Sequence, residues 1–495
     1  MNSENTTAFQ IAKISADTGK NSQNLITAKI ITSFLWLVFI GNLTFLSLNF
    51  NSFPEWVMGD LLKINRFSLL IWTTVTFFSA IVSSYASNYL KGFKYHARFM
   101  CISLAFTCSV MLLVIANHVF LFLFSWLFMG IFMAQLIGID KNWGEAREAS
   151  KYAQKYFLLG TAFLTLGLLL LAFNSGIFTL SEITSIVNEL PIFITIPAAL
   201  LIIAAAIVQS AIYPFHKWLL SAMTSPTPAS ALMHAGFVNG SGILLALFAS
   251  LLFASNMLNV LFIIGGLTAI IAQFTKLLQV NVKQKLACST IAQMGFMIMQ
   301  CGLGFFNAAV VHLILHGFYK SYLFLSAGEE IAQTRPEKAI ELKIQPGQAF
   351  LVVLFGALGA FLFATWTGKG MQLDSGVFLT IIVAITVGQA TYNILKERSL
   401  SVVQKITVPP LLFISGIGLY ALMYNGVTIL MSDMPMIDQP LALSSTQIIF
   451  NVIFLIGFFI MKLGSYKKIP WLYVKLMNMS QPYKKSVLMY KSKAV

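Results

Sequence analysis

Three ionisable side chains, His312, His316 and Lys320, recur at four-residue spacing within one apolar stretch. On an α-helix this spacing places them in one line along a single face. Histidine titrates near neutral pH, and burial can bring a lysine toward the same range. An ionisable residue inside a membrane span costs roughly 2.5–3.5 kcal/mol or more, so such residues commonly mark ion paths. The pattern therefore favours a cation path over the alternative that these groups only hydrogen-bond neighbouring helices.

A second stretch combines helix-breaking residues with a histidine. Pro214, Pro226 and Pro228 interrupt helical hydrogen bonding, and His234 then opens a glycine-rich helix. Broken backbone at membrane depth is tolerated where it lines a cavity or is buried in protein. Composition alone leaves an ordinary interhelical loop as the alternative at this point.

The elements that must position these residues are membrane spans. The chain has 495 residues, of which 58% are hydrophobic and only 10% are charged, whereas soluble domains carry about 25% charged residues. A mean hydropathy of +0.80 indicates an all-α, polytopic helix bundle. About fourteen apolar runs are long enough to span a membrane, at 29–50, 65–90, 98–116, 118–138, 153–177, 190–213, 227–253, 257–280, 286–303, 306–328, 346–367, 376–395, 403–431 and 445–464.

Charge distribution predicts the orientation of these spans. Lys and Arg concentrate in the connections that follow even-numbered runs, whereas those after odd-numbered runs hold only Lys63, Arg66 and Lys369. The positive-inside rule then predicts a multi-pass protein of the cell membrane with both termini in the cytoplasm.

The two ends of the sequence differ in character. We predict a polar cytoplasmic N-terminus at 1–28, with no apolar core of a signal peptide, and a transmembrane domain at 29–464. The basic tail at 465–495 interleaves lysines with apolar residues, which is typical of an amphipathic segment at a membrane surface or a docking segment. A disordered basic tail is the alternative.

Nothing in the sequence indicates an enzyme. Four cysteines lie in or near apolar runs and none forms a CxxC pair, so they are interpreted as reduced core residues. No polar stretch is long enough for a catalytic domain. We therefore predict a transport subunit that has no catalytic residue, no metal site and no cofactor of its own.

Three motifs resemble the large antiporter-like subunits of respiratory complex I and the Mrp antiporters. They occur in the order and at the spacing found in that family, over roughly residues 60 to 370. Their sequences are Pro-Phe-His-Lys-Trp-Leu…Ser-Pro-Thr-Pro-Ala-Ser-Ala-Leu-Met-His-Ala-Gly at 214–236, Val-Lys-Gln-Lys-Leu-Ala-Cys-Ser-Thr-Ile-Ala-Gln-Met-Gly-Phe at 282–296, and His-Leu-Ile-Leu-His-Gly-Phe-Tyr-Lys-Ser-Tyr-Leu-Phe-Leu-Ser-Ala-Gly at 312–328.

The resemblance implies a bundle with two inverted five-helix repeats, each containing a broken helix. It also implies which residues form the ion path. The positions that match the family's central polar axis are His234, Lys283, His312, His316 and Lys320, and Lys369 is aligned with the lysine of the second repeat's broken helix.

Two departures from the family pattern fall in the first repeat. Leu127 follows Trp126 where the family usually has a membrane glutamate, and Gln209 replaces a usual lysine. Lys276 precedes Lys283 by seven residues and would share its face on a continuous helix, so it could supply a local substitute. Alternatively, Lys276 extends to the cytoplasmic surface.

The phrase Met-His-Ala-Gly-Phe-Val-Asn-Gly at 233–240 is most similar to the DabB/MpsA type of inorganic carbon transporter membrane subunit. That type implies a large cytoplasmic DabA/MpsB-type partner, which is β-carbonic-anhydrase-like and holds zinc. H+ or Na+ influx through the membrane subunit would drive CO2 hydration to bicarbonate in the partner. The alternatives are a subunit of a multisubunit Na+/H+ antiporter, a subunit of a complex I-like proton pump, and a passive membrane anchor.

Overall fold

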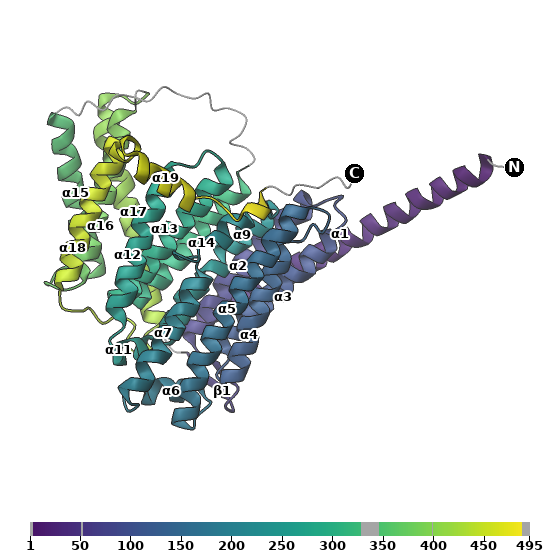
Figure 1. Cartoon of the computed structure of the whole chain (residues 1–495), viewed down its shortest axis with the longest axis horizontal. Coiled ribbons are helices and arrows are strands. Elements are labelled where there is room, and N and C mark those ends of the chain that lie inside the picture. Colours follow the sequence, from purple (N-terminus) through teal and green to yellow (C-terminus); the bar gives the residue numbers. More distant parts are fainter. Residues whose placement is uncertain (1–2, 51–52, 328–345, 398, 488–495) are drawn as a thin grey trace.

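A computed structural model gives the structure of the chain over residues 3–50, 53–327, 346–397 and 399–487. It is a bundle of α-helices with one short antiparallel hairpin of β1 (Trp56–Met58) and β2 (Leu62–Ile64) (Figure 1). The α-helices are α1 (Ser3–Leu48), α2 (Arg66–Tyr89), α3 (His96–Ile115), α4 (Val119–Ile137), α5 (Gly144–Ser175), α6 (Leu180–Ile186), α7 (Ile192–Gln209), α8 (Lys217–Ser221), α9 (Thr227–Ala235), α10 (Gly240–Leu247), α11 (Ala249–Ala254), α12 (Leu258–Leu277), α13 (Val282–Gly302), α14 (Phe306–Leu325), α15 (Pro346–Thr367), α16 (Gly376–Lys396), α17 (Val402–Leu430), α18 (Ser445–Leu463) and α19 (Pro470–Met479).

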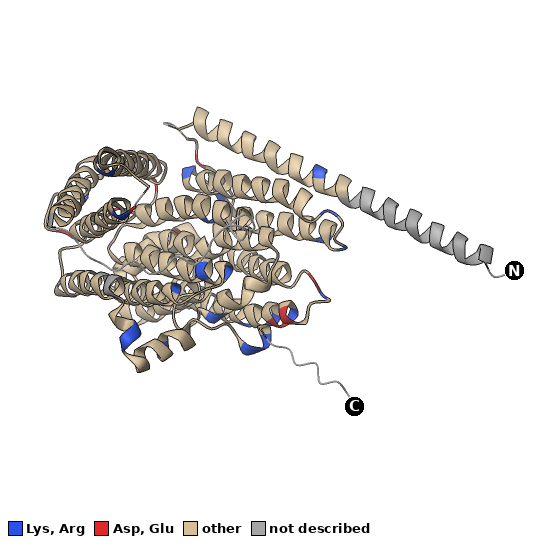
Figure 2. Ribbon diagram, turned by 90° about the horizontal axis from the view of Figure 1, so that it is seen from above, with Lys and Arg blue, Asp and Glu red and all other residues tan. Residues whose placement is uncertain are grey.

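The predicted spans are confirmed as helices. In the described part of the chain, 12 helical segments are long and apolar enough to cross a membrane. Helices α13 and α18 occupy the two remaining predicted positions. Charged side chains are sparse along the length of the bundle (Figure 2), as a hydrocarbon environment requires.

Two helices are longer than their apolar runs. Helix α5 begins at Gly144, because Glu145, Arg147 and Lys151 favour helix even though they are too polar for a membrane core. Helix α1 runs from Ser3 to Leu48, so the predicted boundary between residues 28 and 29 lies inside a helix. The apolar part of α1 is Leu25–Leu48.

The two ends of the bundle are structurally distinct (Figure 1). We call the end crossed by α19 the inner end, and the end that holds the β1–β2 hairpin and α6 the outer end. An ion pair between Arg66 Nε and Asp433 Oδ2, 3.4 Å apart, links the start of α2 to the segment after α17 at the outer end.

Helices α12 and α13 pack unusually closely in the middle of the bundle. A Cβ atom placed on Gly265 would lie 2.6 Å from the carbonyl oxygen of Gly295, and one on Gly295 would lie 2.8 Å from the carbonyl oxygen of Gly265. Only glycine permits this approach, as at many membrane helix interfaces. The contact fixes α13 relative to α12, and α13 in turn packs against α14.

The C-terminal segment folds back over the inner end. The ring of Tyr483 stacks on Tyr152 with centroids 4.3 Å apart, and its backbone N–H donates to Ser221 Oγ at 2.9 Å. His216 Nε2 lies 2.7 Å from the carbonyl oxygen of Met479, so this nitrogen donates. Burial lowers the pKa of His216 to about 4, which keeps the ring neutral at physiological pH. The segment up to residue 487 is therefore packed rather than disordered, and residues 488–495 lie outside the described residues.

Candidate ion-translocation path

We call helices α1 to α11 the first half of the bundle and helices α12 to α19 the second half. The first half contains two interruptions, both at predicted helix breakers. Helix α7 ends at Gln209, and Pro214 lies in the connection to α8. Pro226 caps the start of α9, and Pro228 lies in its first turn. Proline is tolerated at these places because the first turn of a helix has no partner for its N–H groups.

The second interruption follows His234 directly. Helix α9 ends at Ala235, and a short 3₁₀ turn at Phe237–Asn239 leads into α10. Side chains satisfy the carbonyl groups that the break frees. Gln209 Nε2 donates to the Phe237 oxygen at 3.1 Å, Ser210 Oγ donates to the Val238 oxygen, and Asn239 Nδ2 donates to the Ala235 oxygen at 2.8 Å. The broken backbone is thus stabilised within the protein, as membrane depth demands.

The line of polar groups predicted on α14 is present. His316 and Lys320 are buried, and His312 is partly buried beside them. The rings of His312 and His316 stack with centroids 6.1 Å apart. Lys320 has no exposed surface, and its Nζ donates to the backbone oxygen of Leu286 at 2.9 Å. A buried lysine with a single neutral acceptor is in an unusually spare environment for a charged group.

His234 joins this line from the broken helix. Its ring stacks on Phe324 of α14 with centroids 4.4 Å apart, and it interacts electrostatically with Lys320 and Lys283. Both ring nitrogens of His234, and both of His316, are buried and have no hydrogen-bond partner among the described residues. Buried polar groups of this kind are normally satisfied by ordered water, which can also pass protons.

Lys283 and Lys276 lie on different helices. Lys283, in the first turn of α13, donates from Nζ to the Ser225 oxygen at 3.0 Å, next to the proline-containing start of α9. Lys276 lies in the last turn of α12, which ends at Leu277. The helix does not continue between them, because residues 278–281 form a connection, so the shared helical face considered from the spacing is absent.

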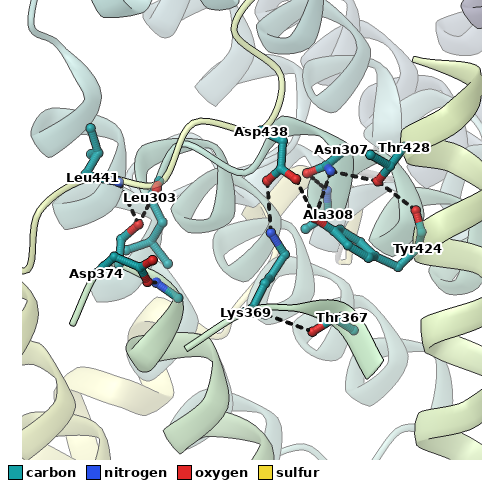
Figure 3. Close-up of polar contacts among 12 residues, drawn as sticks. Leu303, Asn307, Ala308, Thr367, Lys369, Asp374, Tyr424, Thr428, Asp438 and Leu441 are labelled. Atoms are coloured by element: carbon teal, nitrogen blue, oxygen red, sulfur yellow. Dashed lines mark hydrogen bonds and ion pairs between the residues drawn. The ribbon is translucent and has the colours of Figure 1, made fainter. Parts of the chain in front are cut away.

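Lys369 lies at the outer end, in the connection between α15 and α16. Its Nζ is 3.1 Å from Asp438 Oδ1 (Figure 3). The same Nζ lies 3.3 Å from the ring centroid of Phe305. The hydroxyl of Tyr424 donates to Asp438 Oδ2 at 2.8 Å. Burial lowers the pKa of Lys369 to about 8, and the Asp438 carboxylate opposes that shift.

Further polar groups extend this outer network toward α14. Asn307, in the first turn of α14, donates from Nδ2 to Tyr424 Oη at 2.9 Å and to Thr428 Oγ1 at 2.8 Å (Figure 3). Asn307 and His312 lie on the same helix, little more than one turn apart. We define the outer network as Lys369, Asp438, Tyr424, Asn307 and Thr428.

Sequence reasoning included Lys369 but missed the rest of the outer network. Asp438 is 69 residues away in sequence, and only the fold brings the two side chains together. The available signal was an acidic residue in a connection at the same end of the bundle as Lys369. The resemblance aligned Lys369 with the lysine of a broken helix in the second repeat, whereas in the structure Lys369 lies in the connection between α15, which ends at Thr367, and α16, which begins at Gly376.

Two cavities lie in the second half of the bundle, and one of them is lined by a residue of the α14 line. The inner cavity, of about 510 Å³, lies between α12, α13, α16 and α18 and has Gln273, Lys276, Gln293 and Gln389 in its lining. The lateral cavity, of about 370 Å³, is mostly apolar and is lined in part by His312, Gln300 and Tyr420. Phe296, Ile382 and Thr386 line both cavities.

This chain is similar in sequence and in fold to known membrane proteins. The family of NADH:quinone oxidoreductase/Mrp antiporter transmembrane regions matches residues 116–345, which include the broken helix, α13 and α14. Over these residues the chain is similar to the antiporter-like membrane subunits of that family. The Mrp complex from Dietzia sp. DQ12-45-1b has the same fold, with a TM-score of 0.63, 20% identity and coverage of 95% of this chain and 56% of that chain.

Curated proteins similar to this chain include inorganic carbon transporter subunits. The "Probable inorganic carbon transporter subunit DabB" of Hydrogenovibrio crunogenus is 29% identical over 77% of this chain and 74% of its own length. The "Probable inorganic carbon transporter subunit DabB1" of Halothiobacillus neapolitanus is 34% identical over 58% of this chain and 53% of its own length. The chain therefore spans between about half and three quarters of these relatives.

Proposed function

We propose that this chain is the ion-translocating membrane subunit of a two-component inorganic carbon uptake system. In this proposal H+ or Na+ influx through the chain drives CO2 hydration to bicarbonate in a large cytoplasmic partner. The partner is β-carbonic-anhydrase-like and holds the zinc. The chain resides in the cell membrane, and its inner end, which carries the packed C-terminal segment, faces the cytoplasm and the partner.

The observation that carries the ion-translocation role is the buried line on α14. A lysine with no exposed surface and a single neutral acceptor, in line with two histidines, costs folding free energy that a purely structural role does not require. An apolar residue in place of a buried, poorly paired charge is often neutral or stabilising. Retention of Lys320 at this position is therefore best explained by a need to change its charge during transport.

A cation crosses this path in stages in our proposal. At the outer end, the Asp438 carboxylate attracts the cation, and Lys369 alternates between pairing with Asp438 and releasing it. Asn307 and Tyr424 connect this pair to α14. The rings of His312 and His316 then pass the proton, or the charge displacement that accompanies Na+, to Lys320. Lys283 and His234 transmit the change at Lys320 to the inner end by electrostatic repulsion.

The inorganic carbon assignment is supported by the names of the relatives above and by the Met-His-Ala-Gly-Phe-Val-Asn-Gly phrase at 233–240. A second candidate is a subunit of a cation/proton antiporter or respiratory pump, which the family description also covers. Fold alone does not decide between them, because one fold supports several functions.

Growth of a deletion strain decides between these candidates. The strain is grown in ambient air and in air enriched to a few per cent CO2, with a complemented strain as control. We expect a growth defect in air that CO2 enrichment rescues, because the cell then lacks only inorganic carbon. A defect that persists in CO2 and instead follows sodium concentration or alkaline pH contradicts the proposal and supports the antiporter function.

A further inference from the structure

The lateral cavity is a long, mostly apolar slot that runs parallel to α16 and α17. Its lining on α17 extends from Pro409 to Tyr420, which at about 1.5 Å per residue corresponds to about 16 Å. Its lining on α16 extends from Leu379 to Ile394, or about 22 Å. One leaflet of membrane hydrocarbon is about 15 Å thick, so the slot has the length of a single acyl chain. The lining residues of α17 follow helical spacing and form one stripe, which consists of Pro409, Leu412, Phe413, Gly416, Ile417 and Tyr420.

The slot opens sideways onto the membrane. Thr386 and Ala390 on α16 line it and are exposed, and so are Leu412 and Gly416 on α17. Both helices are long and apolar enough to span the membrane, so the medium that reaches these residues is bilayer hydrocarbon. A Cβ atom added to Gly416 would meet no atom within 4 Å, which shows open space at this position. The slot is therefore accessible to a lipid of the surrounding bilayer.

The inner part of the slot contains an unsatisfied hydroxyl group. Thr391 lines the slot and is only 1% exposed, yet its Oγ1 has no hydrogen-bond partner among the described residues. A threonine in a helix can donate to the carbonyl oxygen one turn earlier, as Thr386 does to the Ile382 oxygen at 2.8 Å. Thr391 makes no such bond. A buried hydroxyl without a partner is unfavourable, so this group indicates a ligand that supplies a hydrogen-bond acceptor.

Positive charge lies at the inner end of the slot. Lys405 precedes Pro409 by four residues, so it continues the α17 stripe toward the inner end. It forms no ion pair with a described residue. Lys396, the last residue of α16, lies at the same end. The sequence from 396 to 405 contains three cationic residues and a single carboxylate, so this end of the slot is net positive and attracts a phosphate group.

We propose that the slot binds one phospholipid with an anionic head group from the leaflet at the inner end. Its phosphate lies at Lys396 and Lys405, and one of its ester carbonyl oxygens accepts a hydrogen bond from Thr391 Oγ1. Thr391 lies about 7.5 Å deeper along α16 than Lys396, which matches the order of phosphate and ester in a phospholipid. One acyl chain fills the slot toward His312, which lines its outer part, and covers the α14 line on that side. This inference goes beyond the proposed function, and its test requires neither ion flux nor carbon uptake.

Native mass spectrometry of the purified full-length chain tests the head-group preference. The chain is supplied with phosphatidylglycerol or phosphatidylcholine that carry identical acyl chains, so only the head-group charge differs. We expect one tightly retained phosphatidylglycerol, with an affinity about tenfold higher than that of phosphatidylcholine, because two lysines lie near the phosphate. Equal affinities overturn the anionic head group, and retention of neither lipid overturns the site.

A blocking variant tests whether the acyl chain occupies the slot. Gly416→Phe places a ring in the open space of the slot, so we expect the retained phosphatidylglycerol to be lost. Gly426→Phe is the matched control, because Gly426 lies on the same helix with equal space around it but does not line the slot. This control should retain the lipid. Retention in Gly416→Phe, or equal loss in both variants, overturns the slot as the binding site.

Two conservative variants separate the polar contacts. Thr391→Val keeps the shape of the side chain and removes the hydroxyl, so both lipids should bind about fivefold more weakly, since both have the ester. Thr386→Val is its control and should bind both lipids normally, because that hydroxyl already donates within α16. Lys405→Gln should weaken phosphatidylglycerol alone. Unchanged binding in Thr391→Val, or equal weakening of both lipids in Lys405→Gln, overturns the assigned position of the lipid.

Discussion

The two halves of the bundle differ in the polar side chains that they bury. In the first half, the broken backbone after His234 is closed by neutral side chains, and Gln209 donates directly to the Phe237 oxygen. In the second half, the buried polar groups include Lys320 and Lys369, the two lysines that are buried in the described part of the chain. Both cavities described above also lie there.

This contrast suggests a division of labour. A neutral amide such as that of Gln209 cannot change its charge, and its bond to the Phe237 oxygen stabilises the first-half break. A lysine can change its charge, and at Lys369 burial favours the neutral form while the Asp438 carboxylate favours the charged one. We therefore interpret the first half as a rigid support and the second half as the conducting half.

The largest expected effect concerns Lys320. Lys320→Met should abolish growth in air while the protein remains in the membrane, because an apolar residue fits the site but cannot carry charge. Lys320→Arg tests whether a fixed positive charge at this position is sufficient. Arginine keeps the positive charge but does not release a proton in proteins, since its pKa is above ~12. Growth in air and immunodetection of the chain in membranes are the measurements.

The Arg variant separates two roles for Lys320. Loss of growth with both Met and Arg shows that Lys320 must release its proton. Normal growth with Arg shows that a fixed positive charge is sufficient, and normal growth with Met removes Lys320 from the path. Lys217→Met, at the inner end and outside the line, is the control and should grow normally.

Much of the fold could be predicted from the sequence, because hydrocarbon thickness dictates the length and composition of each span. The runs predicted at α2 to α18 are helices in the structure. The line formed by His312, His316 and Lys320 also follows from spacing alone, since it lies on one helix. The extension of α5 to Gly144 was missed, because hydropathy reports burial in lipid rather than helix length.

The outer network could not be predicted, because its members come from distant parts of the chain. Asp438 meets Lys369 only after α16 and α17 cross the membrane and return. The relation between Lys276 and Lys283 was uncertain for a related reason, since a short break between α12 and α13 decides which faces they share. Long-range pairing is set by packing, and a single sequence carries little direct signal of it.

An intermediate effect is expected at the outer pair. Burial lowers the pKa of Lys369 to about 8, so its ammonium is charged below that pH and is lost as the external pH rises through it. Asp438→Asn removes the carboxylate that opposes this shift, so the pKa of Lys369 falls further. Transport should then fail at an external pH roughly one unit lower than in the native chain.

Growth in air across a series of external pH values measures this shift, with CO2-enriched cultures at each pH as the control for general fitness. Lys369→Ala should reduce transport at all pH values and remove the alkaline dependence. An unchanged pH profile in Asp438→Asn would show that the Lys369–Asp438 pair does not control entry. Glu55→Gln, in an exposed pair with Lys63 at the same end, is the matched control and should leave the profile unchanged.

The smallest expected effect on transport lies in the first half. Gln209→Leu removes the bond to the Phe237 oxygen and leaves that buried carbonyl without this donor, which should cost about 1–3 kcal/mol of stability. Because Gln209 carries no charge, transport per assembled chain should change by less than about twofold. Thermal unfolding of the purified protein and transport normalised to its amount in membranes give the two values. A large transport loss in Gln209→Leu with unchanged stability would contradict the division of labour, because the first-half break would then take part in conduction.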